Sequence, residues 1–218
     1  MPSTRYQKIN AHHYRHIWVV GDIHGEYQLL QSRLHQLSFF PKIDLLISVG
    51  DNIDRGPESL DVLRLLNQPR FTSVKGNHEA MALEAFETGD GNMWLASGGD
   101  WFFDLNDSEQ QEAIDLLLKF HHLPHIIEIT NDNIKYAIAH ADYPGSEYLF
   151  GKEIAESELL WPVDRVQKSL NGELQQINGA DYFIFGHMMF DNIQTFANQI
   201  YIDTGSPNSG RLSFYKIK

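Results

Sequence analysis

Three short apolar runs in the first part of the chain are each followed closely by a glycine and a polar residue. The runs are Ile17–Val20, Leu45–Val49 and Phe71–Val74. The continuous apolar character of the first two is typical of parallel strands that are buried on both faces, and the third is expected to be a further strand. Ligands of open α/β sheets bind just beyond the carboxyl ends of such strands. The polar residues that follow the three runs are therefore expected to meet at one edge of a sheet.

Helices are expected between and after these strands. The segment between the first two runs carries leucines at helical spacing. The segment after the second run does so behind Pro57, a residue suited to a first helical turn. Further helices are predicted from His78 to Thr88 and from Ser108, where Gln111 would complete a capping box.

The second half of the chain favours strands. Ile126–Ile129 and Ile134–Ala139 flank the polar triplet 131–133, which is typical of an antiparallel hairpin. The pattern predicts a mixed α/β protein, with two packed sheets and helices outside them, formed by residues 1–218 as a single domain. Further short strands are expected at Tyr182–Phe185, Ile200–Ile202 and Leu212–Tyr215.

The amino-acid composition excludes several kinds of site and of partner. The absence of cysteine excludes disulfide frameworks, thiolate metal sites and a cysteine nucleophile, and it fits a reducing compartment. The net charge of −12 repels nucleic-acid backbones, so no nucleic-acid partner is expected. No apolar run approaches the ~20 residues of a membrane span, and none precedes Ile17 as a signal peptide would. We expect a cytoplasmic protein that needs no membrane.

Five short motifs hold the residues with the most distinctive chemistry. Their Asp, His and Asn side chains suffice to hold two divalent cations side by side, and the repulsion between these cations requires an anion between them. Mixed imidazole, carboxylate and amide ligands suit Mn, Fe or Zn better than Ca. In chain order the motifs are Gly21–Gly25, Gly50–Gly56, Gly76–Glu79, Ala139–Asp142 and Gly186-His187.

The motifs suggest a ligand for each position. Asp51 is the expected bridge, because it follows the central predicted strand of the first unit. Asp22 and His24 are two residues apart on an extended segment and can approach one ion together. The other ion would be completed by Asn77, His140 and His187.

Two further residues are expected to act on a substrate. Arg55 follows the bridging aspartate and has the planar fork that suits phosphate oxygens. His78 follows a metal ligand and can protonate a leaving oxygen, with Asp54 orienting it. Simpler alternatives stay open: Arg55 could form a surface salt bridge with Glu58, and His78 could cap a helix. A single Asp-x-His-Gly motif could also be an ordinary turn after a strand.

Other residues with distinctive chemistry are given ordinary roles. The histidines outside the motifs are expected at the surface or at helix ends. The tryptophans are expected in the core or in pocket walls, at Trp18, Trp94, Trp101 and Trp161.

With these residues identified, the chain resembles the phosphoprotein phosphatase family of the calcineurin-like metallophosphoesterases. The branch it is most similar to is that of the enterobacterial and lambda-phage serine/threonine phosphatases, through the run Ile17–Gly25 and the phrase His140-Ala141-Asp142-Tyr143-Pro144. The motifs span residues 22–187. The resemblance implies a four-layer α/β/β/α sandwich with two divalent metal ions, most often Mn.

The resemblance also implies roles by position. His78 with Asp54 matches the family's acid pair, and Arg55 matches a phosphate-binding arginine. The first ion would take Asp22, His24 and Asp51, and the second Asp51, Asn77, His140 and His187.

Two phosphate-binding positions are less regular. The family has a second arginine after a late tryptophan, and Arg165, after Trp161, is the candidate here. Relatives often have arginine where this chain has Lys75. A lysine keeps the charge near a phosphate but lacks the bidentate fork, so substrate preference could shift.

The leading hypothesis is a metal-dependent protein phosphatase. It would hydrolyse phosphoserine and phosphothreonine, and phosphotyrosine if the site admits it, by direct attack of a metal-bridging hydroxide. Its partners would be phosphoproteins, and it would be a monomer or a small oligomer. One alternative is a dinucleoside polyphosphate hydrolase, since such enzymes share the motifs. An alternative of another class is a metal-binding scaffold without turnover, although the intact ligands and His78 argue against it.

Overall fold

The first of two mixed sheets holds the three strands predicted at the start of the chain. In the computed structural model, which describes residues 4–218, this sheet has the order β10-β2-β3-β4. Parallel pairing joins β2 (Ile17–Val20), β3 (Leu45–Ser48) and β4 (Phe71–Ser73), while β10 (Phe214–Lys216) runs antiparallel to β2. Residues 1–3, on which the signal-peptide argument partly rests, lie outside the described residues.

The second sheet has six strands in the order β1-β5-β6-β7-β9-β8. The predicted hairpin is confirmed: β5 and β6 pair antiparallel, with Ile127 opposite Ile138. Parallel pairs join β1 to β5, β6 to β7 and β7 to β9, and β8 pairs antiparallel with β9. The strands are β1 (Tyr6–Asn10), β5 (Ile126–Asn131), β6 (Ile134–Ile138), β7 (Tyr182–Phe185), β8 (Gln194–Phe196) and β9 (Gln199–Tyr201).

An apolar layer holds the two sheets together. Ile17 and Ile47 from the first sheet share it with Ile127, Ile138 and Ile184 from the second, and each of these side chains is fully buried. Burial of one such side chain contributes roughly 1.5–3 kcal/mol. This layer therefore fixes the position of the two sheets, and with it the distance between the loops that leave their carboxyl ends.

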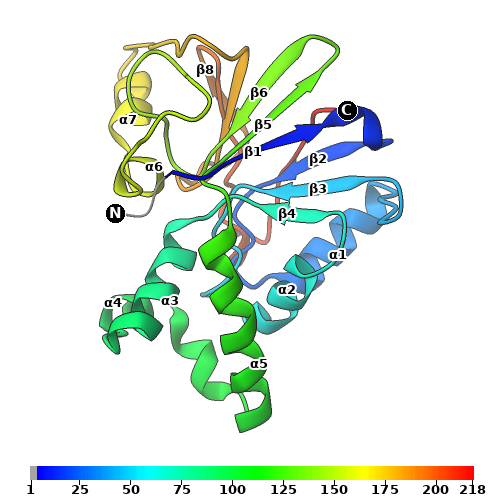
Figure 1. The fold of residues 1–218 in the computed structure, drawn as a ribbon, viewed down its shortest axis with the longest axis vertical. Coiled ribbons are helices and arrows are strands. Elements are labelled where there is room, and N and C mark those ends of the chain that lie inside the picture. Colours follow the sequence, from blue (N-terminus) through cyan, green and yellow to red (C-terminus); the bar gives the residue numbers. More distant parts are fainter. Residues whose placement is uncertain (1–3) are drawn as a thin grey trace.

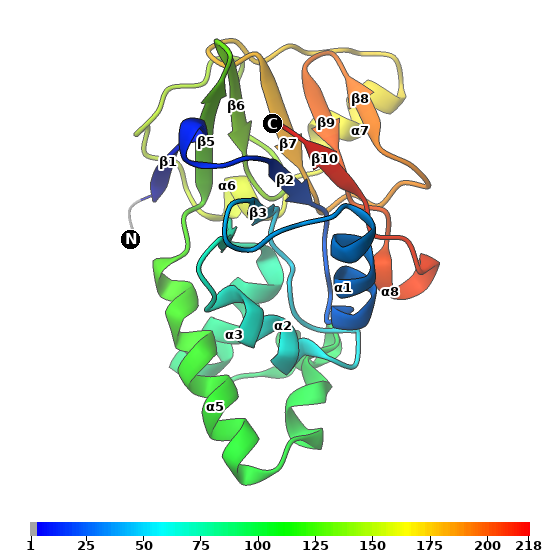
Figure 2. The ribbon, with the colours of Figure 1, turned by 90° about the vertical axis from the view of Figure 1, so that its right-hand side faces the viewer.

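Helices cover the outer face of each sheet (Figures 1 and 2). Leu30 of α1 (Tyr27–Gln36) and Val62 of α2 (Ser59–Leu66) pack against the first sheet. Leu159 of α6 (Ser157–Leu160) and Val166 of α7 (Asp164–Leu170) pack against the second. The result is the predicted α/β/β/α sandwich.

A helical lobe projects from one end of this sandwich, at the bottom of Figure 1. It has its own apolar cluster, which includes Met81, Trp94, Trp101 and Phe120. Its elements are α3 (Asn77–Thr88), α4 (Asn92–Ala96), the 3-10 turns η2 (Gly99–Asp104) and η3 (Leu118–His122), and α5 (Asp107–Leu117).

Several predicted boundaries were wrong by a few residues. Asn106, not Ser108, caps α5: its side chain accepts from Ser108 N and Glu109 N, and Glu109 completes the capping box. Pro57 precedes α2 instead of occupying its first turn, since the helix begins at Ser59. The short elements η1 (Ala11–His13) and α8 (Ser206–Ser209) were not predicted, and neither were α6, α7 and the short helical elements of the lobe described above, α4, η2 and η3.

Two strands were also missed. In β1, which lies at the edge of the sheet, only Ile9 is buried, so it has no apolar run to reveal it. The other edge strand, β8, has only three residues and none of them is buried. Among residues 4–218, no helix has the length and apolar character needed to cross a membrane.

Candidate metal centre

The five motifs converge in space, as predicted. Asp22 follows β2, Asp51 follows β3 and Asn77 begins α3 after β4, while His140 and His187 follow β6 and β7 of the other sheet. Each motif therefore leaves the carboxyl end of a strand, where ligands of α/β sheets bind. The site lies where loops of both sheets meet.

The backbone of these loops is strained at the functional residues themselves. His24, Asp51 and His187 have φ angles of 47°, 49° and 64°, and Asp54 and Arg55 have φ angles of 74° and 68°. Non-glycine residues adopt this left-handed conformation at a cost, and such residues often cluster at functional sites. The strain supports a functional reading of these loops over the alternative of ordinary turns.

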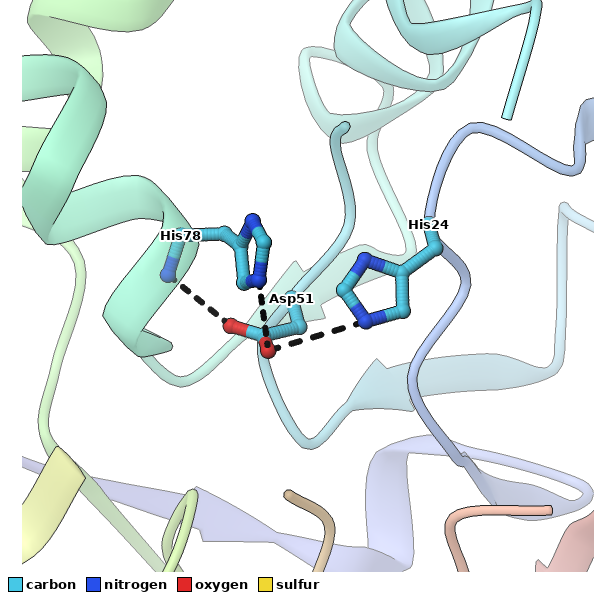
Figure 3. Close-up of side chains that lie close together, drawn as sticks. All are labelled: His24, Asp51 and His78. Carbon is cyan, nitrogen blue, oxygen red and sulfur yellow. Dashed lines mark hydrogen bonds and ion pairs between the residues drawn. The ribbon is translucent and has the colours of Figure 1, made fainter. Parts of the chain in front are cut away.

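One cluster of metal-binding atoms is formed by His24, Asp51 and His78 (Figure 3). His24 Nε2 lies 3.7 Å from Asp51 Oδ2, and His78 Nε2 lies 3.8 Å from the same oxygen. The other oxygen, Asp51 Oδ1, accepts a hydrogen bond from the backbone N–H of His78 (3.0 Å). One carboxylate oxygen of Asp51 therefore faces two imidazoles.

A second cluster shares Asp51 with His140 and His187. His140 Nε2 lies 3.3 Å from Asp51 Oδ1. The amide oxygen of Asn77 lies 2.8 Å from His140 Nε2 and 3.0 Å from His187 Nδ1. All four predicted ligands of the second ion are thus brought together, and Asp51 stands between the two clusters, where a bridge was predicted.

Asp22 is buried beside these clusters. Its two carboxylate oxygens lie 3.0 and 3.3 Å from the backbone N–H of His187, which donates to them. Burial raises the pKa of Asp22 well above its usual value, and the neighbouring carboxylates of Asp203 and Asp51 raise it further. Asp203 was not predicted, because Ile202-Asp203-Thr204 has no recognisable motif.

Hydrogen bonds at the far side of two rings set the tautomers that a cation needs. His24 Nδ1 donates to Ile53 O (3.0 Å), and His140 Nδ1 donates to Val49 O (2.8 Å). A carbonyl only accepts, so each Nδ1 carries a proton and each Nε2 points inward to the site. Burial and the nearby His78 and Arg55 lower the pKa of His24 to about 3, so its ring is neutral with a free lone pair on Nε2.

The electrostatics of the site favour positive charge at its centre. Burial by itself would lower the pKa of His140, yet the carboxylates of Asp51 and Asp22 raise it to about 10. Asp51 in turn has a pKa well below its usual range, since His140, His78 and His24 outweigh its burial. Buried carboxylates, imidazoles and an amide oxygen together form a donor set that fits divalent cations, which would replace the proton on His140.

Glu79 joins two of the motifs, Gly50–Gly56 and Gly76–Glu79. Its buried carboxylate accepts from the backbone N–H groups of Asp51 (2.9 Å), Asn52 (2.8 Å) and Gly76 (2.8 Å). It thereby holds the loop that carries the bridge against the loop that carries Asn77. The Gly-Asn-His-Glu motif included this residue, but sequence reasoning assigned it no role.

His78 and Asp54 form the predicted pair. His78 Nδ1 donates to Asp54 Oδ2 at 2.6 Å, which leaves Nε2 facing the metal clusters. Burial raises the pKa of Asp54, although hydrogen bonds from His78, Trp101 and Trp94 oppose this. For His78 the pKa is raised: burial would lower it, but Asp51 and Asp54 outweigh that effect.

Arg55 points into the site instead of pairing with Glu58. Its two terminal nitrogens donate to His24 Nε2 (2.9 Å) and His78 Nε2 (3.0 Å). Glu58 accepts instead from the backbone N–H of Gln28. The surface salt bridge left open by the sequence is therefore not formed.

A family model described as calcineurin-like phosphoesterase matches residues 15–190, a stretch that contains all five motifs. The chain belongs to this family. Two full-length relatives agree: the chain is 60% identical to serine/threonine-protein phosphatase 2 and 43% identical to serine/threonine-protein phosphatase 1 of Salmonella typhimurium. These alignments cover 100% of this chain and 100% and 99% of the relatives, respectively.

Other proteins match this phosphoesterase at lower identity, and one of them over only part of its length. A symmetrical bis(5'-nucleosyl)-tetraphosphatase of Dechloromonas aromatica is 33% identical over 57% of this chain and 42% of its own length. Among solved structures, one described as a putative diadenosine tetraphosphatase superposes with a TM-score of 0.74 at 23% identity, covering 98% of this chain and 94% of that one. A yeast serine/threonine phosphatase similar to human PP5 superposes with a TM-score of 0.61 at 18% identity, covering 92% and 70%. These two structures support the fold alone.

Arg165 of the phosphoesterase donates its hydrogen bonds to its own chain. Its side chain is buried, with Nε donating to Asp142 Oδ1 (2.8 Å) and one terminal nitrogen donating to the carbonyls of Tyr143 (2.9 Å) and Gly145 (2.7 Å). The guanidinium is thus occupied by the loop that follows His140. These contacts give Arg165 a structural role, and its predicted role in phosphate binding stays a prediction.

Lys75 is also engaged by a neighbour. Its Nζ lies 2.8 Å from Glu156 Oε1, and Glu156 Oε2 accepts from His125 Nε2 at 3.2 Å. The charge of Lys75 is therefore paired with that of Glu156. Of the three predicted phosphate-binding residues, Arg55 is the one that hydrogen-bonds residues of the metal clusters, and the roles of the other two stay predictions.

The contacts of Glu156 with Lys75 and His125 predict a contribution to stability that is lost in acid. Hydrogen bonds from His125 and Lys75 lower the pKa of Glu156 from 4.5 to about 2 against the effect of burial. A lowered carboxyl pKa stabilises the folded state above pH 4.5, and this stabilisation is lost as the pH falls toward 2. Glu156→Gln should lower the free energy of unfolding by about 2–3 kcal/mol at pH 7 and by roughly half as much at pH 3.

Urea denaturation of both proteins at the two pH values tests this. The exposed Glu147→Gln is the matched control and should change stability little at either pH. An equal loss for Glu156→Gln at pH 7 and pH 3 would contradict the assigned charge on Glu156.

Proposed function

We propose that the chain is a metal-dependent protein phosphatase that hydrolyses phosphoserine and phosphothreonine in proteins, with phosphotyrosine as a further substrate to be tested. The observation that carries this is Asp51, placed between two imidazole clusters in a chain of the same length as two serine/threonine-protein phosphatases.

The proposed cofactor is a pair of divalent ions, most readily Mn, with Fe or Zn as further candidates. Two such ions act as Lewis acids toward phosphoryl oxygens and lower the pKa of a bound water to ~7. Asp51 would be shared between them. The first would be held by Asp22, His24 and Asp51, and the second by Asp51, Asn77, His140 and His187.

Arg55 would bind the phosphate. Its guanidinium contacts two imidazole nitrogens in the structure, and phosphate oxygens are stronger, charged acceptors for the same fork. An arriving phosphate monoester would therefore draw Arg55 away from His78 Nε2. The freed Nε2 would then take up a proton from solvent, and the resulting imidazolium of His78 could give this proton to the leaving oxygen.

His78 would protonate the leaving oxygen. With Nδ1 fixed on Asp54 at 2.6 Å, only Nε2 is directed at the site, and it can donate a proton to a serine or threonine oxygen as that oxygen departs. These alkoxides are poor leaving groups, so the proton is needed most for such substrates.

A second candidate is hydrolysis of dinucleoside polyphosphates. It is supported by the partial similarity to a symmetrical bis(5'-nucleosyl)-tetraphosphatase. That similarity covers little more than half of this chain, whereas the phosphatase likeness covers all of it. We rank it second for this reason.

Rates on phosphoserine and phosphothreonine peptides and on diadenosine tetraphosphate, all with Mn, test the proposal. We expect phosphate release from the peptides, without competition by AMP. Rapid cleavage of the polyphosphate with no turnover of either peptide would contradict it. A metal-loaded protein that hydrolyses none of these, nor p-nitrophenyl phosphate, would favour the scaffold alternative.

Some expectations from the sequence stay predictions. These are the cytoplasmic location, the monomeric or small oligomeric state, the single-domain organisation of residues 1–218, and the absence of nucleic-acid and membrane partners.

A further inference from the structure

Two buried tryptophans of the helical lobe donate to the same carboxylate in the catalytic loop. Trp94 Nε1, from α4, lies 2.9 Å from Asp54 Oδ1 and 3.1 Å from Oδ2. Trp101 Nε1, from η2, lies 2.8 Å from Asp54 Oδ1. Both indoles are more than nine-tenths buried, and their rings meet edge to face at 6.3 Å. The carboxylate that orients His78 is therefore held from the lobe side as well.

The two carboxylate oxygens of Asp54 accept their shortest hydrogen bonds from different partners. An indole N–H only donates and an ionised carboxylate only accepts, so each contact has one possible direction. Oδ1 accepts the shorter bonds of both tryptophans, which leaves Oδ2 turned to His78 Nδ1 at 2.6 Å. Bonds to a buried charged group are stronger than neutral ones and define its orientation more tightly. The two tryptophans thus set the rotation of the Asp54 carboxylate.

The same segment also supports the backbone of the loop. Arg55 N donates to Gly98 O at 3.0 Å, between the two tryptophans in sequence. Gly98 has φ 106°, and a Cβ there would lie 2.8 Å from Arg55 N, so the two backbones are in close contact. Asp54 and Arg55 have strained left-handed conformations of their own. A strained pair persists where its surroundings hold it, and residues 94–101 provide that support.

We propose that Trp94 and Trp101 are positioning residues for proton transfer. They hold the Asp54 carboxylate so that His78 keeps Nδ1 protonated and Nε2 aimed at the leaving oxygen. The inference rests on the proposed phosphoester hydrolysis, with His78 as the acid. It makes the lobe a part of the active site, although no residue of α4 or η2 belongs to either metal cluster.

Packing alone would not require this arrangement. The rings of Trp94 and Trp101 fill the apolar core of the lobe together with Phe102. Phenylalanine supplies a ring at the same place without the N–H. The substitution Trp→Phe therefore separates the hydrogen bond from most of the packing.

The test compares two substrates that differ in their need for an acid. Phenyl phosphate and p-nitrophenyl phosphate present the same phosphate, but nitrophenolate is a stable anion that departs with little help. For Trp101→Phe and Trp94→Phe we expect kcat on phenyl phosphate to fall roughly 10-fold, the size typical for loss of an orienting bond. On p-nitrophenyl phosphate kcat should fall less than about 2-fold, with KM unchanged for both.

The matched control is Trp18→Phe. Trp18 Nε1 is buried on β2 and has no hydrogen-bond acceptor among residues 4–218. This variant removes the same atom and should leave the ratio of the two rates unchanged. His78→Asn provides the reference for full loss of the acid, and thermal unfolding of each variant reports any loss of packing.

The outcomes are distinct. A fall confined to phenyl phosphate supports the positioning role. An equal fall on both substrates, or no fall on either, overturns it. Neither substrate is a protein, so this test does not depend on the proposed preference for phosphoserine and phosphothreonine in proteins. An enzyme that cleaves both phenyl esters but no phosphopeptide would contradict the proposed function, while the ratio of the two rates would still decide the positioning role.

Discussion

Asp51→Asn is expected to lower kcat/KM on a phosphoserine peptide by about 10³-fold or more. The carboxylate is the only group that both clusters share, with Oδ1 3.3 Å from His140 and Oδ2 3.7 Å from His24. An amide is neutral, so it cannot offset the repulsion between two cations, and one of its atoms is a donor. Loss of metal stabilisation costs several kcal/mol, and each 1.36 kcal/mol is a factor of ten in rate.

The measurement is steady-state hydrolysis at saturating Mn, together with a Mn titration of the variant. Asp115→Asn, on the exposed face of α5, is the control and should behave as the parent. A variant that retains more than a tenth of the activity at the same Mn concentration would show that Asp51 does not bridge.

His78→Asn is expected to slow phosphoserine hydrolysis by roughly 10²–10³-fold and p-nitrophenyl phosphate hydrolysis far less. General acid catalysis typically contributes 10²–10⁴-fold, and its value falls as the leaving group becomes a better anion. His78 Nδ1 is bonded to Asp54 Oδ2 at 2.6 Å, so of the two nitrogens of the His78 ring only Nε2 faces the site.

The paired rates of each variant on the two substrates check this prediction. His35→Asn, on the exposed side of α1, removes a histidine of no assigned role and should change neither rate. Equal losses of His78→Asn on both substrates would remove His78 from the acid role and point to metal binding instead, since its Nε2 lies 3.8 Å from Asp51.

The sequence predicted the part of the fold that carries the metal ligands. Buried parallel strands leave continuous apolar runs, and Ile17–Val20 and Leu45–Ser48 are such runs in the structure. The polar motifs that follow them had to meet at one sheet edge, which is what the structure shows for Asp22 and Asp51. This inference needs only local patterns and the geometry of α/β sheets.

Edge strands and the helical lobe were harder to foresee. Tyr6–Asn10 pairs with β5 through its backbone while most of its side chains face solvent, so hydrophobic periodicity cannot reveal it. The lobe helices carry apolar residues at helical spacing, but nothing in that spacing says that Trp94 and Trp101 turn their N–H groups to Asp54. Contacts between residues 40 or more positions apart depend on how the elements pack.

The phosphate-binding arginines show the same limit. Both Arg55 and Arg165 are cations near motif residues, and sequence position alone could not separate them. The structure does so through their partners: Arg55 contacts the imidazoles of the site, while Arg165 is taken by Asp142 and two carbonyls. A buried arginine satisfied by its own chain has few donors left for a substrate.

The most direct measurement of the central claim is metal content set against activity. The protein would be stripped with EDTA, titrated with Mn by calorimetry, and assayed on phosphoserine peptide at each step. The shared carboxylate of Asp51 predicts an inactive stripped protein that regains its rate as two Mn ions bind per chain. Full activity in the stripped protein, or no Mn binding at all, would contradict the account.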